Sequence, residues 1–435
     1  MKILVSFLAC FFCIFSTRAE NIIDYELTTD NLPYTENFAP EKSYLSEHAM
    51  DFSSSVVVNS DVIGYQIHPA TVYDAKRQIW HTAWWNRSSN KKVNQIYYAY
   101  SYDEGQTWSI NERVDKSPLG AEYPCMVLNK KGRPVIAWAD YRKGGRDIYA
   151  SKRNDEGWTK PIRINDGLFH TAYKPSMTFY KGLFVAVWTD ERDGLPNIYT
   201  STSTDGKHWT TNIRANDGLG YGPVTSNPRI IAGKNGTIYL VFNGWEGQAY
   251  GGGRFPDIYF TKSTDYGQSW MSPQVRVNIQ TDYYQQDPDI TVDAKGNLYV
   301  VWEDNWEDFF TIRIYFAKSE DGGMSWTNKV IDDGPVYSVR MHPKIISNGK
   351  DLDVAWGVDN RNRNNYQRVF FTLSKNYGET WSNDQLVNDN PRSNINDALS
   401  LSGNGQGAIY CLWHEFLKNS GQEFYNILSA KGTKK

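Results

Sequence analysis

The sequence has few cysteines, no charge excess of either sign and no long apolar run beyond its first residues. It contains four cysteines, of which Cys10 and Cys13 lie in an N-terminal apolar run. Cys125 and Cys411 are far apart, and each lies in an apolar stretch, so we expect buried thiols and exclude a disulfide scaffold. The 46 Lys and Arg balance the 49 Asp and Glu without a basic block, which argues against nucleic acid as a partner.

The N-terminus predicts export. Lys2 precedes an apolar run from Ile3 to Phe15, and small residues at Thr17 and Ala19 fit a signal peptidase site. We expect cleavage after Ala19 and a secreted or periplasmic protein. The run is shorter than the ~20 residues that span a bilayer, and no later segment predicts a transmembrane helix. A lipoprotein is disfavoured because Cys10 lies inside the apolar run.

Aromatic residues are abundant instead. The chain holds 16 Trp, 29 Tyr and 19 Phe, which favours β-structure and would also suit stacking against sugar rings. Repeat-related packing in the core accounts for most of these aromatic residues.

One sequence motif recurs along the chain: a short strand around a proline, a strand ending in Trp-x-Asp, then Asp-Ile-Tyr and a tight glycine turn. The aromatic residue of the second strand occurs seven times, at spacings of 50 to 60 residues. The seven are Trp84, Trp138, Trp188, Phe242, Trp302, Trp356 and Trp413. Each interval accommodates a four-stranded antiparallel sheet, and radial repetition of such sheets makes a propeller. We therefore predict an all-β, seven-bladed β-propeller.

The glycine turn has the pattern Ser-x-Asp-x-Gly-x-Ser/Thr-Trp, complete from Ser101 to Trp108, from Ser263 to Trp270 and from Ser319 to Trp326. Asp103 can accept backbone N–H bonds inside the turn, and Gly105 supplies a backbone angle that other residues resist. The pattern resembles the Asp-box of sialidases and related propellers. That resemblance implies that the boxes lie at the rim, away from the site of any chemistry.

The seventh blade is one strand short, since the chain ends soon after the strand near Tyr425–Leu428. The segment Ser54–Val58 precedes the first blade, so we expect this N-terminal strand to pair with the last blade and close the ring. The expected domains are a signal peptide over 1–19, an N-terminal extension over 20–50 and one propeller over 51–435.

Ligands of propellers bind where the inner strands converge, so the candidates stand near the first-strand proline or after the second-strand aromatic. His68, Tyr123, Arg142 and Tyr173 are the candidate catalytic residues. The candidate substrate-binding residues are Asn86, Lys174, Arg192, Arg229, His342 and His414. Trp-x-Asp-x-Arg recurs between blades, so a structural Asp–Arg pair is the more economical interpretation of each such Asp.

Sialidases open with Tyr-Arg-Ile-Pro, whose arginine binds the substrate carboxylate. The corresponding phrase here is Tyr65-Gln66-Ile67-His68-Pro69, which lacks the arginine, and seven blades are expected where sialidases have six. Both departures argue against an exo-sialidase.

The general plan is similar to secreted seven-bladed lyases that cut ulvan, a sulfated, uronate-containing algal polysaccharide. In those enzymes a His on the first blade, a Tyr and an Arg on the second and a Tyr on the third surround the cleavage site. His68, Tyr123, Arg142 and Tyr173 fall on these blades in this order. The resemblance implies β-elimination, in which the guanidinium offsets a uronate carboxylate while Tyr and His exchange protons.

The leading hypothesis is thus a polysaccharide lyase or dehydratase acting on an acidic, sulfated polymer such as ulvan. The alternatives are a sialidase-like glycosidase and a propeller that binds carbohydrate or protein without catalysis. No cofactor is required by this chemistry. A structural Ca²⁺ or Zn²⁺ stays open, although no ligand spacing points to either metal. We expect a monomer.

Overall fold

The computed structural model describes residues 50–60, 64–87, 93–167, 171–216, 226–245, 255–281, 283–305, 311–334, 338–359, 367–388, 399–419 and 422–434. All of them belong to one compact unit, Leu45–Lys435. The expected signal peptide and N-terminal extension, up to residue 49, lie outside the described residues. No helix that could cross a membrane occurs within the described ranges.

Blades one to three are antiparallel sheets built from consecutive strands. Blade one comprises β3 (Tyr65–Asp74), β4 (Ile79–Arg87), β5 (Asn94–Ser101) and β6 (Glu112–Arg113). Blade two comprises β7 (Ala121–Leu128), β8 (Pro134–Asp140), β9 (Asp147–Asn154), β10 (Gly157–Trp158) and β11 (Ile162–Arg163). Blade three comprises β12 (Ala172–Tyr180), β13 (Leu183–Asp190), β14 (Asn197–Ser203) and β15 (Ile213–Arg214).

Blades four to six repeat the same order. Blade four comprises β16 (Ser226–Ala232), β17 (Ile238–Gly244), β18 (Asp257–Ser263) and β19 (Val275–Arg276). Blade five comprises β20 (Gln285–Val292), β21 (Leu298–Asp304), β22 (Arg313–Ser319) and β23 (Thr327–Val330). Blade six comprises β24 (Val339–Asn348), β25 (Asp351–Asp359), β26 (Gln367–Ser374) and β27 (Gln385–Leu386).

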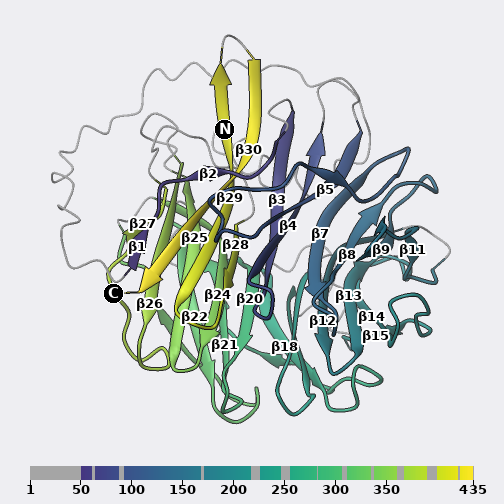
Figure 1. Cartoon of the computed structure of the whole chain (residues 1–435). Coiled ribbons are helices and arrows are strands. Elements are labelled where there is room, and N and C mark those ends of the chain that lie inside the picture. The colour runs from purple at the N-terminus through teal and green to yellow at the C-terminus, as the bar shows by residue number, and fades with distance from the viewer. Residues whose placement is uncertain are drawn as a thin grey trace, which may run out of the picture. The chain divides into compact units, whose positions relative to one another are not determined.

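Blade seven draws strands from both ends of the chain. Its strands are β28 (Ser400–Gly403), β29 (Ala408–Asn419), β30 (Gln422–Lys434), β1 (Met50–Phe52) and β2 (Val56–Val57). Val56 pairs with Ser429 and Val57 with Leu428, which confirms the predicted N-terminal closing strand. β1 adds a second pairing with β30 that was not predicted. In Figure 1 the yellow β30 lies beside the purple β3, where Tyr425 and Tyr65 form a parallel bridge.

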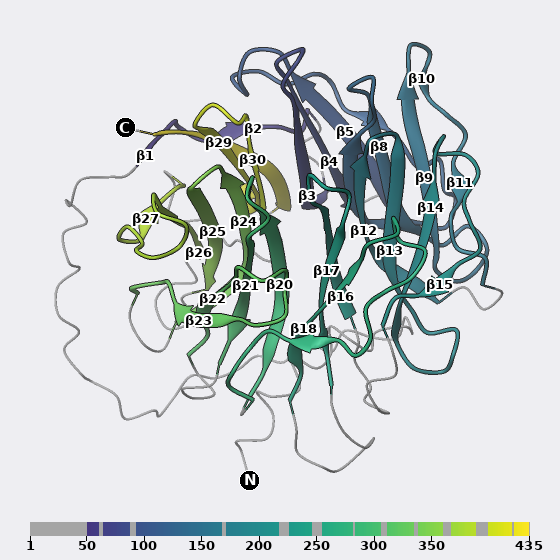
Figure 2. The same cartoon turned by 90° about the horizontal axis from the view of Figure 1, so that it is seen from below.

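The first strands of the seven blades are the innermost. Each contacts the first strand of the next blade, from β3 and β7 through β24 and β28, and β28 contacts β3 again. Figure 2 shows β3, β12, β16, β20 and β24 following one another in this way. The described residues therefore form a seven-bladed propeller, as the repeat predicted.

The repeated aromatic residue of the second strand forms the core. All seven, from Trp84 to Trp413, are at most 1% exposed, and apolar clusters join each blade to its neighbour. Three of the indoles donate hydrogen bonds to the Asp two residues later, as Trp138 does to Asp140 at 2.8 Å. The Asp of Trp-x-Asp therefore satisfies a buried indole N–H, which is a structural role.

The Asp-boxes also behave as expected. Asp103 accepts hydrogen bonds from the backbone N–H of Thr107 at 2.9 Å and from its hydroxyl at 2.6 Å, and Gly105 has a φ of 78°. Cys125 and Cys411 are free thiols, and burial raises the pKa of each above its ordinary value.

Candidate functional site

A repeated backbone irregularity marks the beginning of the inner strands. In six blades the residue before the first-strand proline has a left-handed backbone, with φ between 50° and 55°. These residues, called the inner ring here, are His68, Tyr123, Lys174, Asn227, Asp287 and His342. Each sits at a shift of register between the first and second strands. Such a bulge redirects a side chain, and a non-glycine residue with this φ costs about 1–3 kcal/mol.

The inner ring and the Asp-boxes lie at opposite ends of the blades. In blade two Ala121 pairs with Asp140 and Asp140 with Asp147, so the strand ends next to Tyr123 share one end of the sheet. An Asp-box follows the other end of a third strand, as Ser101 does in β5. Substitutions in a box are thereby separated from any chemistry at the inner ring.

Blades one and two contribute an aromatic group to the inner ring. The His68 imidazole stacks on Trp85, with centroids 5.7 Å apart and planes 13° from parallel. It meets the Tyr123 ring edge-on, with centroids 5.1 Å apart. Two of the four candidate catalytic residues are therefore in contact. Both exchange protons, and a stacked indole fixes the orientation of the imidazole.

Tyr173 lies beside this aromatic group. Burial raises the pKa of the Tyr173 hydroxyl, and the charge of Glu191 and the nearness of Tyr123 add to the rise. The Arg146 guanidinium opposes the rise and lies over the Tyr173 ring, 4.2 Å from its centroid. Arg146 also approaches Glu191 at 3.8 Å. Tyr173 is accordingly a neutral hydroxyl held against a guanidinium.

A partly buried carboxyl group, that of Glu122, stands next to Tyr123 in β7. It accepts hydrogen bonds from the Tyr141 hydroxyl at 3.0 Å and from the Asn94 amide. Burial raises the pKa of Glu122 in spite of these bonds and of the charges of Arg146 and Arg87. Glu122 thus links β7 to Asn94 of blade one and to Tyr141 of its own blade.

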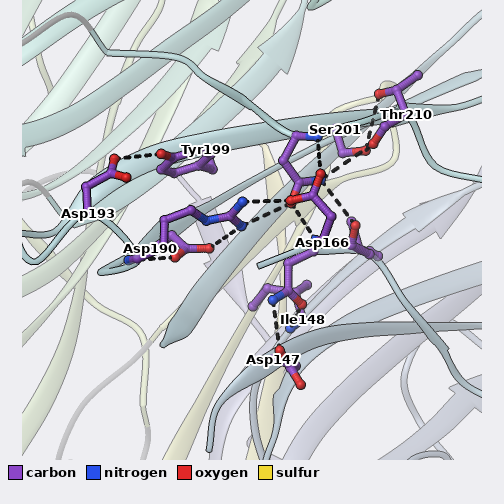
Figure 3. Close-up of polar contacts among 12 residues, drawn as sticks. Asp147, Ile148, Asp166, Asp190, Asp193, Tyr199, Ser201 and Thr210 are labelled. Carbon is purple, nitrogen blue, oxygen red and sulfur yellow. Dashed lines mark hydrogen bonds and ion pairs between the residues drawn. The ribbon is translucent and has the colours of Figure 1, made fainter. Parts of the chain in front are cut away.

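Arg142 and Arg192 are held in equivalent repeat pairs. Arg142 binds Asp140 at 2.6 Å and the Asp115 carbonyl at 2.9 Å, and lies over the Tyr149 ring. The Arg192 guanidinium donates to the Asp190 carboxylate at 2.6 Å and to the Asp166 carboxylate at 2.7 Å. Figure 3 shows these two carboxylates, together with Tyr199 bonded to Asp193. The guanidinium near Tyr173 thus belongs to Arg146, a residue outside the site predicted from the sequence.

Polar residues of blades three to six form a hydrogen-bonded arc. Lys174 donates to the side-chain Oδ1 of Asn227 at 2.5 Å, and the side-chain Nδ2 of Asn227 donates to Asp287. Asp287 in turn meets His342 Nδ1 at 3.0 Å. Four inner-ring residues from four blades are therefore linked. Two residues further along β16 and β20, Arg229 lies 3.8 Å from Asp289.

Glu303 completes a cluster with Asp287 and His342. Its Oε1 lies 3.6 Å from His342 Nδ1 and accepts the His342 backbone N–H at 2.6 Å. Burial and the charge of Asp287 raise the pKa of Glu303 to about 7. Burial would raise the pKa of Asp287 as well, but His342, Lys174 and Lys344 hold it far below its ordinary value. The environment thus separates the protonation of two adjacent carboxyl groups.

Asp287, Glu303 and His342 could together hold a metal ion, because one donor atom of each lies within 4.8 Å of the others. No other such group of His, Cys and carboxylate residues occurs in the described ranges. Their surroundings fit a cation poorly. Lys344 lies close enough to Asp287 and Glu303 for their charges to influence its pKa, and Lys174 influences Asp287. Neighbouring ammonium groups already offset the carboxylate charge.

The remaining candidates are buried. Asn86 is in β4 and His414 in β29, where the imidazole meets the Tyr425 ring edge-on at 5.5 Å. The sequence-predicted site lacks Trp85 and Glu303, which directly follow the second-strand tryptophan in Trp84-Trp85-Asn86 and Trp302-Glu303-Asp304. The residue at this position differs from blade to blade, and that variation was the available signal.

Comparisons with known proteins agree with the propeller. The model of the BNR repeat-like domain matches residues 182–415. A comparison with curated proteins gave no match.

Several solved structures are similar to the chain. One is an ulvan lyase, a polysaccharide lyase bound to -[GlcA(1-4)Rha3S]-, with a TM-score of 0.56 and 12% identity over 86% of this chain and 95% of that one. A protein of unknown function from Dyadobacter fermentans has a TM-score of 0.55 and 15% identity, over 89% and 100%. The NanB sialidase from Streptococcus pneumoniae has a TM-score of 0.50 and 14% identity, over 86% and 69%. At these identities the likeness establishes the fold.

Proposed function

The chain belongs to the family of BNR repeat-like domains, and we propose that it is a carbohydrate-active enzyme that cleaves acidic polysaccharides by β-elimination. The observation that supports this proposal best is the contact of His68 with Tyr123 next to the Tyr173–Arg146 pair. Proton-exchanging groups and a guanidinium are the parts that elimination next to a carboxylate needs.

Arg146 would offset the uronate carboxylate. A planar fork binds a carboxylate through two hydrogen bonds, which makes the neighbouring C–H more acidic. In this proposal Arg146 takes the role first considered for Arg142, because Arg142 is already bonded to Asp140 and Asp115.

His68 and Tyr123 would share the removal of the proton. The carbon–hydrogen bond next to the carboxylate breaks, its electron pair forms a carbon–carbon double bond, and the bond to the leaving oxygen breaks. Tyr173 would orient the sugar through its hydroxyl group, and Trp85 would stack on a sugar ring. Lys174 and Arg229 would meet further acidic groups of the polymer.

Glycoside hydrolysis is the second candidate. It is favoured by the adjacent carboxyl groups of Asp287 and Glu303, one ionised and the other with a pKa near 7, as an acid–base pair requires. Against this candidate, the Glu303 side chain is only 2% exposed, which limits direct contact with substrate.

One experiment separates the candidates. Purified protein is incubated with polysaccharides that contain or lack uronic acid, each with and without sulfate, while reducing ends and ultraviolet absorbance of the new double bond are followed. Elimination produces both signals in equal amounts and only with uronate. Reducing ends without the absorbance would establish hydrolysis instead, and the absence of both signals would leave the non-catalytic propeller.

A further inference from the structure

The His342 imidazole is held on one side by two carboxyl groups. Its Nδ1 lies 3.0 Å from Asp287 Oδ2 and 3.6 Å from Glu303 Oε1. The other oxygen of each carboxyl group is occupied elsewhere: Asn227 donates to Asp287 Oδ1, and Gln286 donates to Glu303 Oε2 at 3.0 Å. These outer bonds turn the inner oxygens toward the imidazole.

This arrangement fixes the orientation of the His342 ring. When carboxylates hold Nδ1–H, the ring adopts one orientation, and Nε2 lies on the side of the ring away from them. The His342 side chain is 25% exposed, whereas that of Glu303 is 2% exposed. A ligand at the inner ring can therefore reach the imidazole.

The surrounding charges favour a protonated imidazole. Asp287 is ionised, and the Glu303 carboxyl group can lose its proton near neutral pH, so negative charge accumulates next to Nδ1. Lys174, Arg229 and Asp289 on neighbouring strands and Lys344 on β24 itself surround the cluster. The three cations oppose protonation of the imidazole, whereas Asp289 favours it and Asp287 favours it from 3.0 Å.

His342 also stands at the right end of the molecule. It occupies in blade six the inner-ring position that His68 and Tyr123 occupy in blades one and two. Blade seven lies between, since β24 contacts β28 and β28 contacts β3. The carboxylate-backed imidazole and the His68–Tyr123 pair thus share one end of the inner ring.

We propose that His342 is the acid that protonates the leaving oxygen, with Asp287 and Glu303 as its positioning residues. This inference rests on the eliminative function proposed above. As the bond to the leaving oxygen breaks, that oxygen takes the proton from Nε2. The imidazole becomes neutral and regains its proton from water before the next turnover.

A leaving-group comparison tests this role. His342→Gln is assayed on a natural uronate oligosaccharide and on a synthetic uronate whose leaving group at the same position is nitrophenolate, which needs no proton. The variant should lose about 10²–10⁴-fold in kcat/KM on the natural bond and less than tenfold on the nitrophenolate. Glu303→Gln should lose activity in the same selective manner but to a smaller degree. His208→Gln, at an exposed Asp-box histidine, is the matched control and should retain activity on both.

The experiment distinguishes failure of the proposed role of His342 from failure of the proposed eliminative function. If the unaltered protein forms no double bond with either substrate, the eliminative function itself fails. If it does, and His342→Gln loses equally on both substrates or on neither, His342 is not the leaving-group acid. Calorimetric titration with Zn²⁺ and with Mn²⁺ provides the second measurement. Micromolar binding that His342→Gln abolishes would make the cluster a metal site and overturn the inference.

Discussion

Side chains of the inner ring take part in the proposed chemistry because their backbone is unusual. The recurrent proline predicted where these residues stand, and His68, Tyr123 and Lys174 do occupy bulges at the beginning of inner strands. Their left-handed conformation could not be predicted, because a residue before proline ordinarily prefers an extended backbone. The surrounding sheet imposes it, and sheet register is a long-range property.

Arg146 shows why residue roles were harder to predict than residue positions. Arg142 belongs to the repeated Trp-x-Asp-x-Arg phrase, and the same repetition that made it visible gives it a structural partner, Asp140. Arg146 precedes Asp147 at the beginning of the third strand and reaches the next blade, where it covers Tyr173. Contacts between blades leave no pattern within one repeat.

The two arginines should therefore respond differently to the same substitution. Arg146→Lys should lower kcat/KM on an acidic polysaccharide by about 10–10²-fold, because an ammonium group cannot replace a bidentate fork, with little change in Tm. Arg142→Lys should instead lower the free energy of unfolding by about 1–3 kcal/mol, because bonds to buried Asp140 are lost. Turnover and thermal melting measured on both variants test this. The reverse pattern would return the substrate role to Arg142.

Among the elements, the Asp-box turns were predicted in most detail because their interactions are local. Asp265 accepts the backbone N–H of Ser269 at 2.8 Å and of Gln268 at 3.1 Å. Asp265→Ala should lower the free energy of unfolding by about 0.5–2 kcal/mol and leave turnover per folded molecule unchanged. Asp155→Ala, at an exposed carboxylate paired with Arg133, is the control and should cost less than about 0.5 kcal/mol. Unchanged melting with lost activity for Asp265→Ala would place the site at the box end.

Contacts between outer strands of neighbouring blades follow a second, unpredicted pattern. Asp166 and Asn212 each accept the other's backbone N–H, at 2.8 and 2.7 Å, and Ser60 and Asn111 do the same. Between blades five and six, Asp333 and Asp384 form this reciprocal pair with two carboxyl groups. Burial and the charge of Asp333 raise the pKa of Asp384 to about 8.

The acidic pair should make stability depend on pH. The folded state keeps a proton on Asp384 that the unfolded state releases near pH 4, so the stabilisation present at low pH is lost as pH rises toward 8. Asp384→Asn removes this loss. The variant should melt close to the unaltered protein near pH 4 and be more stable than it by about 5 kcal/mol at pH 8. Thermal melting of both proteins between about pH 4 and pH 8 tests this. A difference in stability that stays constant over this pH range would show that Asp384 is ionised in the folded protein.

At the scale of the whole molecule, the seven-fold repeat and the N-terminal closing strand were predictable from the sequence alone. The extent of closure was not. β1 lies against blade six, where the Gln385 side chain bonds both the N–H and the carbonyl of Met50. Pairings that join the first residues of the propeller to the last depend on the assembled ring and on no local pattern.

Ring closure should control the stability of the whole propeller. A chain beginning at Asp61 lacks β1 and β2, exposes the edge of β30 and loses the buried side chains of Met50 and Val58. Relative to a chain beginning at Met50, it should lose at least about 3 kcal/mol of unfolding free energy. Denaturant unfolding of the two chains measures the difference, and equal midpoints would mean that closure does not depend on these strands.

The inner ring of blades one to three is proposed to perform proton transfer on a carbohydrate. Tyr123→Phe removes one hydroxyl group and keeps the ring that meets His68, so folding should survive. The decisive measurement is the rate at which Tyr123→Phe and His68→Ala release product from the best polysaccharide substrate. A fall of about 10²–10⁴-fold in each, with Tm preserved for Tyr123→Phe, is the predicted result. Full activity in both variants would contradict the claim.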